Sequence, residues 1–289
     1  MASTQQLKSR IRSVKSTKQI TKAMQMVAAS KMRRAQEATK SSQAYTMAAR
    51  ELLTYLAAQG ATNGHKWFTV RPVKSRLLIV IASDKGLAGA YNANILKAYV
   101  RELKADDAAN IANKTIAVGR KIAQAATRIK DTEIVGTYED LPDHFSGAEF
   151  HAILNTAKDM FEANQVDAVD VIFTRFVSSL TQRADVVRLF PAGFTPTDDV
   201  QPDIAEAKFE PSPKQIIDDI AYRLISARLF QALMDSRASE HSMRMLAMKN
   251  ATDNATDLVD ALTLEMNKAR QAAITQELTE ISAGVEAMR

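Results

Sequence analysis

Cysteine is absent from this sequence of 289 residues, and only four histidines occur in it. Without thiols the chain forms no disulfide and no thiolate metal site, which favours an intracellular location. The four histidines show no spacing typical of metal ligands; they are His65, His144, His151 and His241. We therefore expect neither a bound metal nor a cofactor.

Long apolar runs are also missing. No stretch approaches the roughly 20 apolar residues that a membrane-spanning helix needs, and the first residues, MASTQQLKSRIRS, lack the apolar core of a secretory signal. Hydrophobic residues make up 46% of the chain and charged residues 25%, which is typical of a globular protein that buries a core. We expect no integral membrane protein.

Proline and glycine are missing from both ends of the chain. All seven prolines lie within residues 72–213, eight of the nine glycines lie within residues 60–193, and residues 1–59 and 214–283 contain neither. Because these residues interrupt helices, we predict a helix at each end, roughly 80 and 100 Å long at about 1.5 Å per residue. The predicted domains are an N-terminal helix (1–59), a central α/β domain (60–213) and a C-terminal helix (214–289).

The C-terminal helix carries a heptad seam, in which alternating steps of four and three residues connect small, methionine or weakly polar side chains. Its members are Met234, Ala238, His241, Met245, Met248, Thr252, Ala255, Val259, Leu262, Met266, Ala269, Ala273, Gln276 and Glu280. Such a period makes two helices wind around each other with a left-handed supercoil. Small side chains allow close approach but bury less apolar surface than leucine does. The helix therefore needs a partner, and the seam suits a contact that slides.

The N-terminal helix, with Ser3 or Thr4 as its expected N-cap, has an apolar stripe that includes Leu7, Ile11, Val14, Ile20, Met24 and Val27. The six-residue step from Val14 to Ile20 predicts a local break in the heptad. Residues 1–34 contain no acid and nine basic residues, which are Lys8, Arg10, Arg12, Lys15, Lys18, Lys22, Lys31, Arg33 and Arg34. The whole chain has a net charge of +5, so the basicity is local. Such a helix needs an acidic partner.

Three classes of acidic partner fit this helix: nucleic acid, an anionic membrane surface and an acidic protein surface. A solvated helix face needs no partner, but self-repulsion among nine like charges costs helix stability unless something offsets it. No aromatic residue precedes Tyr45, so the helix lacks a platform for stacking bases and lacks the Trp or Phe that anchors a face in lipid. An acidic protein surface is the best interpretation.

The central segment alternates between strand and helix patterns. Strands are expected at 76–82, 114–118 and 133–138, and helices near 92–104, 121–129 and 146–165, the last capped by Ser146. Two further strands, 168–176 and 184–190, are close enough for an antiparallel hairpin. This order predicts a Rossmann-like α/β layer with a largely parallel sheet.

The segment SDKGLAGAYN (83–92) follows the first strand, where a doubly wound sheet binds nucleotides. Its G-x-x-G spacing lacks the dinucleotide fingerprint, and no G-K-[ST] phosphate loop follows. Ser83 and Asp84 could serve as nucleophile and acid, but no histidine lies nearby in sequence, and a helix cap explains them more simply. We expect a structural turn and no catalytic residue.

Four motifs resemble the gamma subunits of the F-type ATP synthases and occur in that family's order. They are ITKAMQMVAASKMRRAQ (20–36), SDKGLAGAYN (83–92), MKNATDNATDLV (248–259) and NKARQAAITQELTEISAG (267–284). The resemblance implies an antiparallel coiled coil of the two terminal helices around a central Rossmann-like insert. It also implies a non-catalytic rotor shaft inside a ring of three alpha and three beta subunits, beside the epsilon subunit and the membrane ring of c subunits, at the cytoplasmic face of the cell membrane.

The resemblance also assigns contact residues. The implied contacts with a beta subunit are Lys22, Met24, Lys31, Arg33, Arg34, Ala88, Arg270 and Gln271. The implied upper bearing contains Ile281, Val285 and Met288, and the implied foot near the c ring and epsilon contains Phe209 and Glu210. Among these, the guanidinium of Arg270 is suited to bind a carboxylate through two hydrogen bonds.

Two other functions stay open from the sequence alone. A basic coiled-coil protein could bind nucleic acid, and its DNA affinity would then depend steeply on salt. An α/β enzyme could use the turn at 83–92, and the insert would then bind a nucleotide saturably. The four ordered motifs favour the shaft over both.

Overall fold

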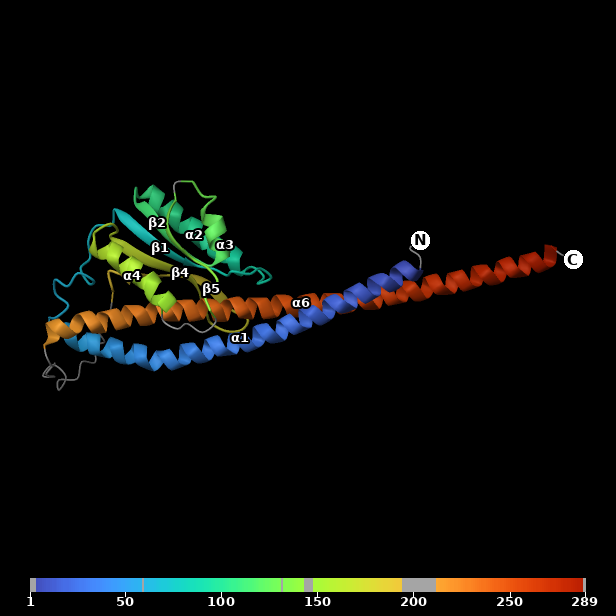
Figure 1. Cartoon of the computed structure of the whole chain (residues 1–289), viewed down its shortest axis with the longest axis horizontal. Helices are drawn as coiled ribbons and strands as arrows, with labels where there is room; N and C mark the ends of the chain where they lie inside the picture. Colours follow the sequence, from blue (N-terminus) through green and yellow to red (C-terminus); the bar gives the residue numbers. More distant parts are fainter. Residues whose placement is uncertain (1–3, 59, 131, 143–147, 194–211, 288–289) are drawn as a thin grey trace. The chain divides into compact units, whose positions relative to one another are not determined.

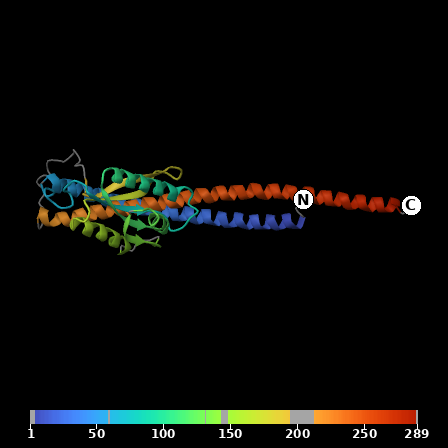
Figure 2. The ribbon, with the colours of Figure 1, turned by 90° about the horizontal axis from the view of Figure 1, so that it is seen from above.

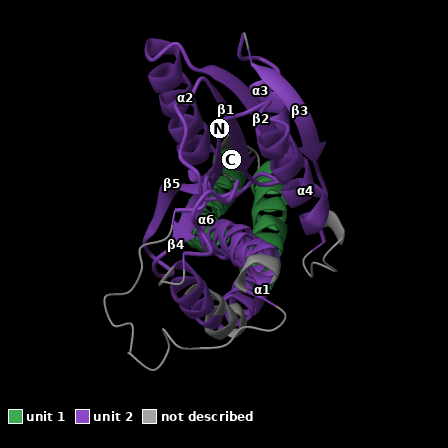
Figure 3. Ribbon diagram, turned by 90° about the vertical axis from the view of Figure 1, so that its left-hand side faces the viewer, with its two compact units in different colours: residues 1–28, 244–289 green, residues 29–243 purple. Residues whose placement is uncertain are grey.

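The computed structural model describes residues 4–58, 60–130, 132–142, 148–193 and 212–287 (Figure 1). Contacts within the chain divide it into two compact units (Figure 3): unit 1 comprises residues 1–28 and 244–289, and unit 2 comprises residues 29–243. The predicted caps Ser3 and Ser146 lie outside the described residues.

Two long helices confirm the prediction made from the missing proline and glycine. Helix α1 (Thr4–Ala58) has 55 residues and helix α6 (Pro213–Ala287) has 75. Proline occurs in α6 only at its first position, where no helical hydrogen bond is lost. Among the described residues, no helix combines the length and the apolar character that crossing a membrane requires.

In unit 1 the first part of α1 packs antiparallel against α6 (Figure 2). Leu7 and Ile11 of α1 form a buried cluster with Leu262 of α6. Further along α1, the hydroxyl of Thr21 lies 2.8 Å from the hydroxyl of Thr252, and the two are hydrogen-bonded. The contact positions fall along α6 as they rise along α1, which defines the antiparallel direction.

Burial along α1 corrects the predicted apolar stripe. Ile20 and Val27 are 58% and 56% exposed, whereas their neighbours Thr21 and Ala28 are buried. Buried and half-buried residues follow steps of four and three without interruption: Leu7, Ile11, Val14, Lys18, Thr21, Gln25 and Ala28. The predicted break after Val14 is wrong because polar side chains, Lys18 and Thr21, occupy the heptad positions there.

The predicted seam of α6 is its buried face over much of its length. In unit 1 the buried members are Met248, Thr252, Ala255 and Leu262, and the half-buried members are Met245, Val259, Met266 and Ala269. Residues 270–283 are all exposed, including the seam positions Ala273, Gln276 and Glu280. The reason is that α6 extends past the beginning of α1 in unit 1 (Figures 1 and 2).

Unit 2 contains a five-stranded sheet with the order β3-β2-β1-β4-β5. The strands are β1 (Ser75–Ile81), β2 (Ala112–Val118), β3 (Glu133–Tyr138), β4 (Ala168–Phe176) and β5 (Gln182–Phe190). Strand β1 pairs in parallel with β2 and β4, β2 pairs in parallel with β3, and β4 pairs antiparallel with β5. The predicted largely parallel sheet and its terminal hairpin are confirmed.

Helices α2 (Tyr91–Ala108) and α3 (Arg120–Ala126) cover one face of this sheet. Leu78 and Val80 of β1 join Ile95 and Tyr99 of α2 in one buried cluster, which also includes Ile122 of α3. Successive strand residues point to opposite faces, so the alternate residues of β1 pack in a second core on the other face of the sheet.

The opposite face packs against α4 (Ala148–Glu162), the end of α1 and the beginning of α6. Leu77 and Ile79 of β1 share this cluster with Leu56 of α1, Leu154 of α4 and Leu229 of α6. A sheet that is covered on both faces requires strands that are apolar on both sides. This explains the continuous apolar run RLLIVIA at the first strand.

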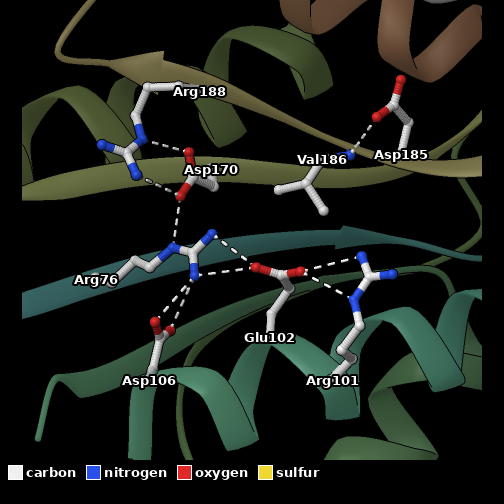
Figure 4. A network of polar contacts seen from close by, with 8 residues as sticks. All are labelled: Arg76, Arg101, Glu102, Asp106, Asp170, Asp185, Val186 and Arg188. Atoms are coloured by element: carbon white, nitrogen blue, oxygen red, sulfur yellow. Dashed lines mark hydrogen bonds and ion pairs between the residues drawn. The ribbon is translucent and has the colours of Figure 1, made fainter. Parts of the chain in front are cut away.

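A buried ionic network connects β1, β4, β5 and α2 (Figure 4). Arg76 of β1 is only 8% exposed, and it donates hydrogen bonds to Asp170 at 2.5 Å, to Asp106 at 3.0 Å and to Glu102 at 3.2 Å. Arg188 of β5 also donates to Asp170. Buried charges are tolerated only when they are paired in this way.

The pKa values of Arg76 and Asp106 are both raised, for different reasons. Burial opposes the charge of Arg76, but attraction by Asp170 and Asp106 outweighs it and raises the pKa of Arg76. Burial likewise raises the pKa of Asp106, and Arg76 offsets only part of that rise. One guanidinium is shared among three carboxylates, so each receives a fraction of its attraction.

Candidate partner-binding surface

The N-terminal end of α1 presents charge of one sign. In unit 1, Lys8, Arg10, Arg12, Lys15 and Lys22 are exposed, and Lys18 is half-buried. The first acid in the chain is Glu37. The ammonium of Lys22 donates to the neutral amide oxygen of Gln25 at 3.4 Å, so this contact does not compensate its charge. An uncompensated basic helix attracts acidic surfaces.

The predicted contacts further along α1 differ in their environment. Met24 is half-buried in unit 1, while Arg33 and Arg34 are exposed and Lys31 is half-buried in unit 2. Lys31 and Arg34 line one hollow together with three residues of α6, whereas Arg33 does not line it. Arg33 and Arg34 look equivalent in the sequence, but the structure places only Arg34 at the hollow.

The turn at 83–92 connects β1 to α2 and is held by its own side chains. Ser83 is buried, its N–H donates to Asn92 Oδ1 at 3.1 Å, and Asn92 Nδ2 donates to Ser83 Oγ at 2.8 Å. Leu87 has a φ of 61° and is 62% exposed, whereas Ala88 is only 2% exposed. The contact at Ala88 stays a prediction, and Leu87 is the large side chain that this turn presents to solvent.

Asp84 caps a helix, but not the one that follows it in sequence. Helix α2 begins after Ala90, which makes no side-chain cap bond. Asp84 Oδ1 instead accepts the N–H of Arg120, the first residue of α3, at 3.0 Å, and the N–H of Asp140 at 3.1 Å. The carboxylate thus satisfies a helical N–H that has no partner inside the helix. The structure gives Ser83 and Asp84 structural bonds and brings no histidine to them among the described residues.

The exposed end of α6 carries several predicted contacts. Arg270 and Gln271 are exposed, and Ile281 is 64% exposed. Two further apolar side chains, Ile274 and Leu278, are 49% and 62% exposed. Together with Ile281 they form an exposed apolar stripe on α6, in which successive residues are four and three positions apart. Sequence reasoning missed them because they lie beside the seam. The side chain of Val285, and the residues Met288, Phe209 and Glu210, lie outside the described part of the chain.

The histidines make separate contacts. His65 Nε2 lies 2.6 Å from Asp218 Oδ1, and His151 Nδ1 lies 2.9 Å from the hydroxyl of Tyr222. His241 is buried in unit 2, and His144 is outside the described residues. Within the described ranges, no group of three or more His, Cys, Asp or Glu side chains could hold a metal ion.

A buried acid that the sequence patterns did not indicate lies on α6. Asp235 is 8% exposed and lines a cavity of about 500 Å³ between α6 and the strands β4 and β5. Burial raises the pKa of Asp235 to about 6, although attraction by Arg175 opposes the rise. Its carboxyl group therefore keeps its proton to a much higher pH than an exposed aspartate does.

Known proteins similar to this chain share its whole length. A family model described as ATP synthase matches residues 3–288. The ATP synthase gamma chains of Desulforamulus reducens and Staphylococcus haemolyticus are 38% and 35% identical over 288 residues, and each alignment covers 100% of both chains.

Solved structures show the same fold. A chain of the Euglena gracilis mitochondrial ATP synthase matches with a TM-score of 0.69 at 20% identity, over 99% of this chain and 94% of that chain. A chain of the Tetrahymena thermophila mitochondrial ATP synthase, from its central stalk and c-ring structure, matches with a TM-score of 0.59 at 24% identity, over 80% of this chain and 99% of that one.

Long terminal helices with exposed basic and apolar side chains, joined to an α/β unit, are typical of a class of subunit that works through contacts with partners. The chain belongs to the ATP synthase gamma chain family.

Proposed function

We propose that this chain is the central-stalk, or rotor, subunit of a proton-translocating ATP synthase. In this role it couples rotation of the membrane c ring to conformational changes at the catalytic sites of the beta subunits, where ATP is made and hydrolysed. The observation that carries the proposal is α6, a helix of 75 residues whose seam is buried as far as Leu262 and whose residues 270–283 are all exposed. Such an end offers its side chains to surrounding subunits.

The shaft in this proposal is an antiparallel coiled coil of residues 1–59 and 214–289, and the central α/β domain (60–213) forms its foot. Uninterrupted heptad burial in both helices of unit 1 supports the coiled coil, as does the Thr21–Thr252 hydrogen bond. The absence of proline and glycine from residues 1–59 and 214–283 keeps each helix stiff over these ranges. A stiff shaft with a small, weakly polar seam transmits rotation while its surface passes different partners.

The partners in this proposal are three alpha and three beta subunits, the epsilon subunit and the c ring. The chain is then a peripheral protein at the cytoplasmic face of the cell membrane and reaches the membrane only through the complex. Full-length similarity to the gamma chains of Desulforamulus and Staphylococcus supports this placement.

The contact residues are also proposals. Lys22, Met24, Lys31, Arg33, Arg34, Ala88, Arg270 and Gln271 are assigned to beta, Ile281, Val285 and Met288 to the upper bearing, and Phe209 and Glu210 to the foot. The exposure of Lys22, Arg33, Arg34, Arg270, Gln271 and Ile281 supports their part of this assignment. Each contact stabilises the complex by roughly 1–3 kcal/mol, because stronger contacts would stop turnover.

In this mechanism the angle of the shaft determines how far each beta subunit populates its open or its closed conformation. Its faces differ, since the basic residues of α1 and the apolar stripe of α6 lie on different helices. A beta subunit that meets the basic face therefore experiences a different contact free energy from one that meets the apolar stripe. This difference selects an open or a closed catalytic site.

A reversible disulfide tests whether the chain turns. Leu87→Cys places one thiol at the exposed part of the 83–92 turn in a chain that has no other cysteine. Paired with a cysteine on beta whose Cα lies within about 7 Å, it forms an intersubunit disulfide on oxidation. ATP hydrolysis should stop when the disulfide forms and return on reduction, although no catalytic residue changes.

The control is the same complex without the cysteine on beta, which should keep its activity under oxidation. Turnover that persists with the crosslink fully formed would mean that the chain is a static scaffold.

A further inference from the structure

The side chain of Asp235 on α6 is buried but not bonded. Asp235 is 8% exposed, and Arg175 of β4 attracts its carboxylate electrostatically. No hydrogen bond or ion pair joins Asp235 to another residue in the described part of the chain. Buried polar groups almost always have a hydrogen-bond partner, and a buried charge without one is costly. The position of Asp235 therefore indicates a missing hydrogen-bond donor.

Asp235 lines a cavity of about 500 Å³, and all the described residues of its wall belong to unit 2. This volume lies in the range of small-molecule sites and is much larger than a single water needs. Much of the wall is apolar and includes Val171 and Phe173 of β4, Leu189 of β5 and Leu224 of α6. A wide apolar wall with a few polar groups is typical of a site for an organic ligand.

The polar residues of the cavity come from one face of α6 and one face of β4. Arg228, Gln231 and Asp235 are three and four residues apart, so they share a face of the helix. Phe173 and Arg175 are two residues apart, so they share a face of the strand. The packing of α6 on the sheet therefore brings Arg175 to the cavity that Asp235 lines.

The charges of the cavity favour a molecule that carries both signs. Arg175 donates from Nε to Asp185 at 2.7 Å, while its two terminal amino groups donate to no described residue. The other charged residues of the described wall are Asp235, Arg188 and Arg228. Three guanidinium groups repel a simple cation, and the carboxylate of Asp235 repels a simple anion. A zwitterion avoids both repulsions.

We propose that this cavity binds a zwitterionic amino acid with an apolar side chain. The ammonium group of the ligand pairs with Asp235, and its carboxylate accepts hydrogen bonds from the terminal amino groups of Arg175. Its side chain lies against Phe173 and Leu224. Both charged groups of an α-amino acid are attached to one carbon, so a single molecule pairs with Asp235 and Arg175 at the same time. None of the cavity residues is among the contacts assigned to the rotor, so the site goes beyond that function.

Protonation of Asp235 gives the site a pH dependence. Burial raises the pKa of Asp235 to about 6, and the neutral acid does not pair with an ammonium group. At pH 5, one unit below this value, only about a tenth of the carboxyl groups are ionised. The other charged residues of the described wall are arginines on β4, β5 and α6, and guanidinium groups stay charged at both pH values. Asp235 alone among them therefore sets the pH dependence of binding.

Equilibrium dialysis of the full chain with radiolabelled L-phenylalanine tests the proposal. At pH 7 the binding should saturate at about one molecule per chain, and the affinity should fall about tenfold at pH 5. Two matched probes identify the charges that matter: phenethylamine lacks the carboxylate of phenylalanine, and 3-phenylpropanoate lacks its ammonium group. Each should compete about tenfold more weakly than L-phenylalanine, as expected when a charged hydrogen bond is lost.

Matched variants identify the side chains that hold the ligand. Asp235→Asn should lower the affinity for L-phenylalanine about tenfold at pH 7 and remove its pH dependence. Asp219→Asn, at an exposed position of the same helix outside the cavity, should change neither.

Arg175→Gln should lower the affinity for L-phenylalanine to that for phenethylamine, because the partner of the ligand carboxylate is lost. Arg183→Gln is the matched control, since Arg183 also contacts Asp185 but does not line the cavity. The fluorescence of Trp67, in the core of unit 2, shows whether each variant is folded.

Three outcomes would overturn the proposal. The first is that none of L-phenylalanine, L-leucine and L-methionine binds saturably. The second is that phenethylamine binds as tightly as L-phenylalanine, which would make the cavity a site for simple amines. The third is that Asp235→Asn binds like the unmodified chain, which would place the amino acid elsewhere. None of these outcomes affects the Leu87 disulfide test, so the site and the rotor can fail independently.

Discussion

The two compact units use the same pair of helices in opposite ways. In unit 2, the end of α1 and the beginning of α6 bury large aliphatic side chains such as Leu56 and Leu229 against a five-stranded sheet. Among the described residues of unit 1, the buried apolar cluster between the helices consists of Leu7, Ile11 and Leu262. Apolar burial is the main source of stability, so unit 2 holds most of it, and unit 1 is the part that opens at lower cost.

The two units also differ in how their charged side chains are compensated. In unit 2 the buried Arg76 is bound to three carboxylates of the same unit. Unit 1 exposes a run of basic residues in a stretch of α1 without a single acid. The ionic network of the sheet is therefore paired within unit 2, whereas the first part of α1 in unit 1 exposes charges of one sign.

Among the changes that test this difference between the units, removing the carboxylate at the centre of the ionic network should cause the largest loss of stability. Asp170→Ala removes the carboxylate that Arg76 and Arg188 share, and the loss should be about 3 kcal/mol, the low end for breaking a buried ion pair, because Asp106 and Glu102 still compensate Arg76. Urea unfolding of the full chain, followed by the fluorescence of the single Trp67 in the core of unit 2, measures the loss. Asp107→Ala, at an exposed position of α2, is the control and should change stability by less than about 0.5 kcal/mol.

The buried acid of α6 should produce a smaller effect with a characteristic pH dependence. Asp235 has a pKa of about 6 in the folded chain, against an ordinary value of 3.8. Between these values the folded chain binds more protons than the unfolded chain, so stability falls as pH rises and the loss is complete above about pH 6. Asp235→Asn removes this loss and should stabilise the chain at pH 8 by up to about 3 kcal/mol.

Unfolding free energies measured from pH 4 to pH 8 test whether Asp235 causes this pH dependence. The advantage of Asp235→Asn should shrink toward pH 4, while Asp219→Asn, at an exposed acid of the same helix, should follow the unmodified chain. Parallel curves for Asp235→Asn and the unmodified chain would contradict the assignment.

The smallest effect should be local to unit 1. Leu262→Ala removes one of the three residues of its buried cluster and should cost about 2 kcal/mol, the low end for a leucine in a core. Hydrogen exchange should become faster along α6 within unit 1, with no change in unfolding monitored by Trp67. Leu264→Ala, two residues away and 58% exposed, is the matched control. An equal loss in the Trp67 signal would show that the two units unfold together.

Local patterns were sufficient to predict the elements of the sheet. The run RLLIVIA predicts β1, and the paired segments 168–176 and 184–190 predict the hairpin of β4 and β5, because strand patterns depend on neighbouring residues. The long helices follow equally directly from the missing proline and glycine. Contacts between distant residues could not be predicted in this way. Asp84 caps a helix that begins 36 residues later, and Arg76 finds Asp170 on another strand.

The candidate partner-binding surface could likewise be predicted only in part from the sequence. The basic residues of α1 are visible in the sequence because they are consecutive in one segment, whereas Arg237 and His241 join Lys31 only through the packing of two distant helices. The α1 stripe was misjudged for a physical reason: a heptad position in a thin seam tolerates Lys18 or Thr21, since a long or small polar side chain reaches water or a helix carbonyl from there.

The hydrogen bond between Thr21 and Thr252 has a consequence for how the two helices move. Each hydroxyl also has an acceptor inside its own helix: Thr21 Oγ1 lies 3.0 Å from the carbonyl oxygen of Lys18, and Thr252 Oγ1, which donates to Thr21, lies 2.8 Å from that of Met248. When the bond between the helices breaks, neither hydroxyl is left unsatisfied, so its loss costs only about 1 kcal/mol and not the penalty of a buried unpaired group. The contact between the two threonines can therefore break and form again at a low cost in free energy.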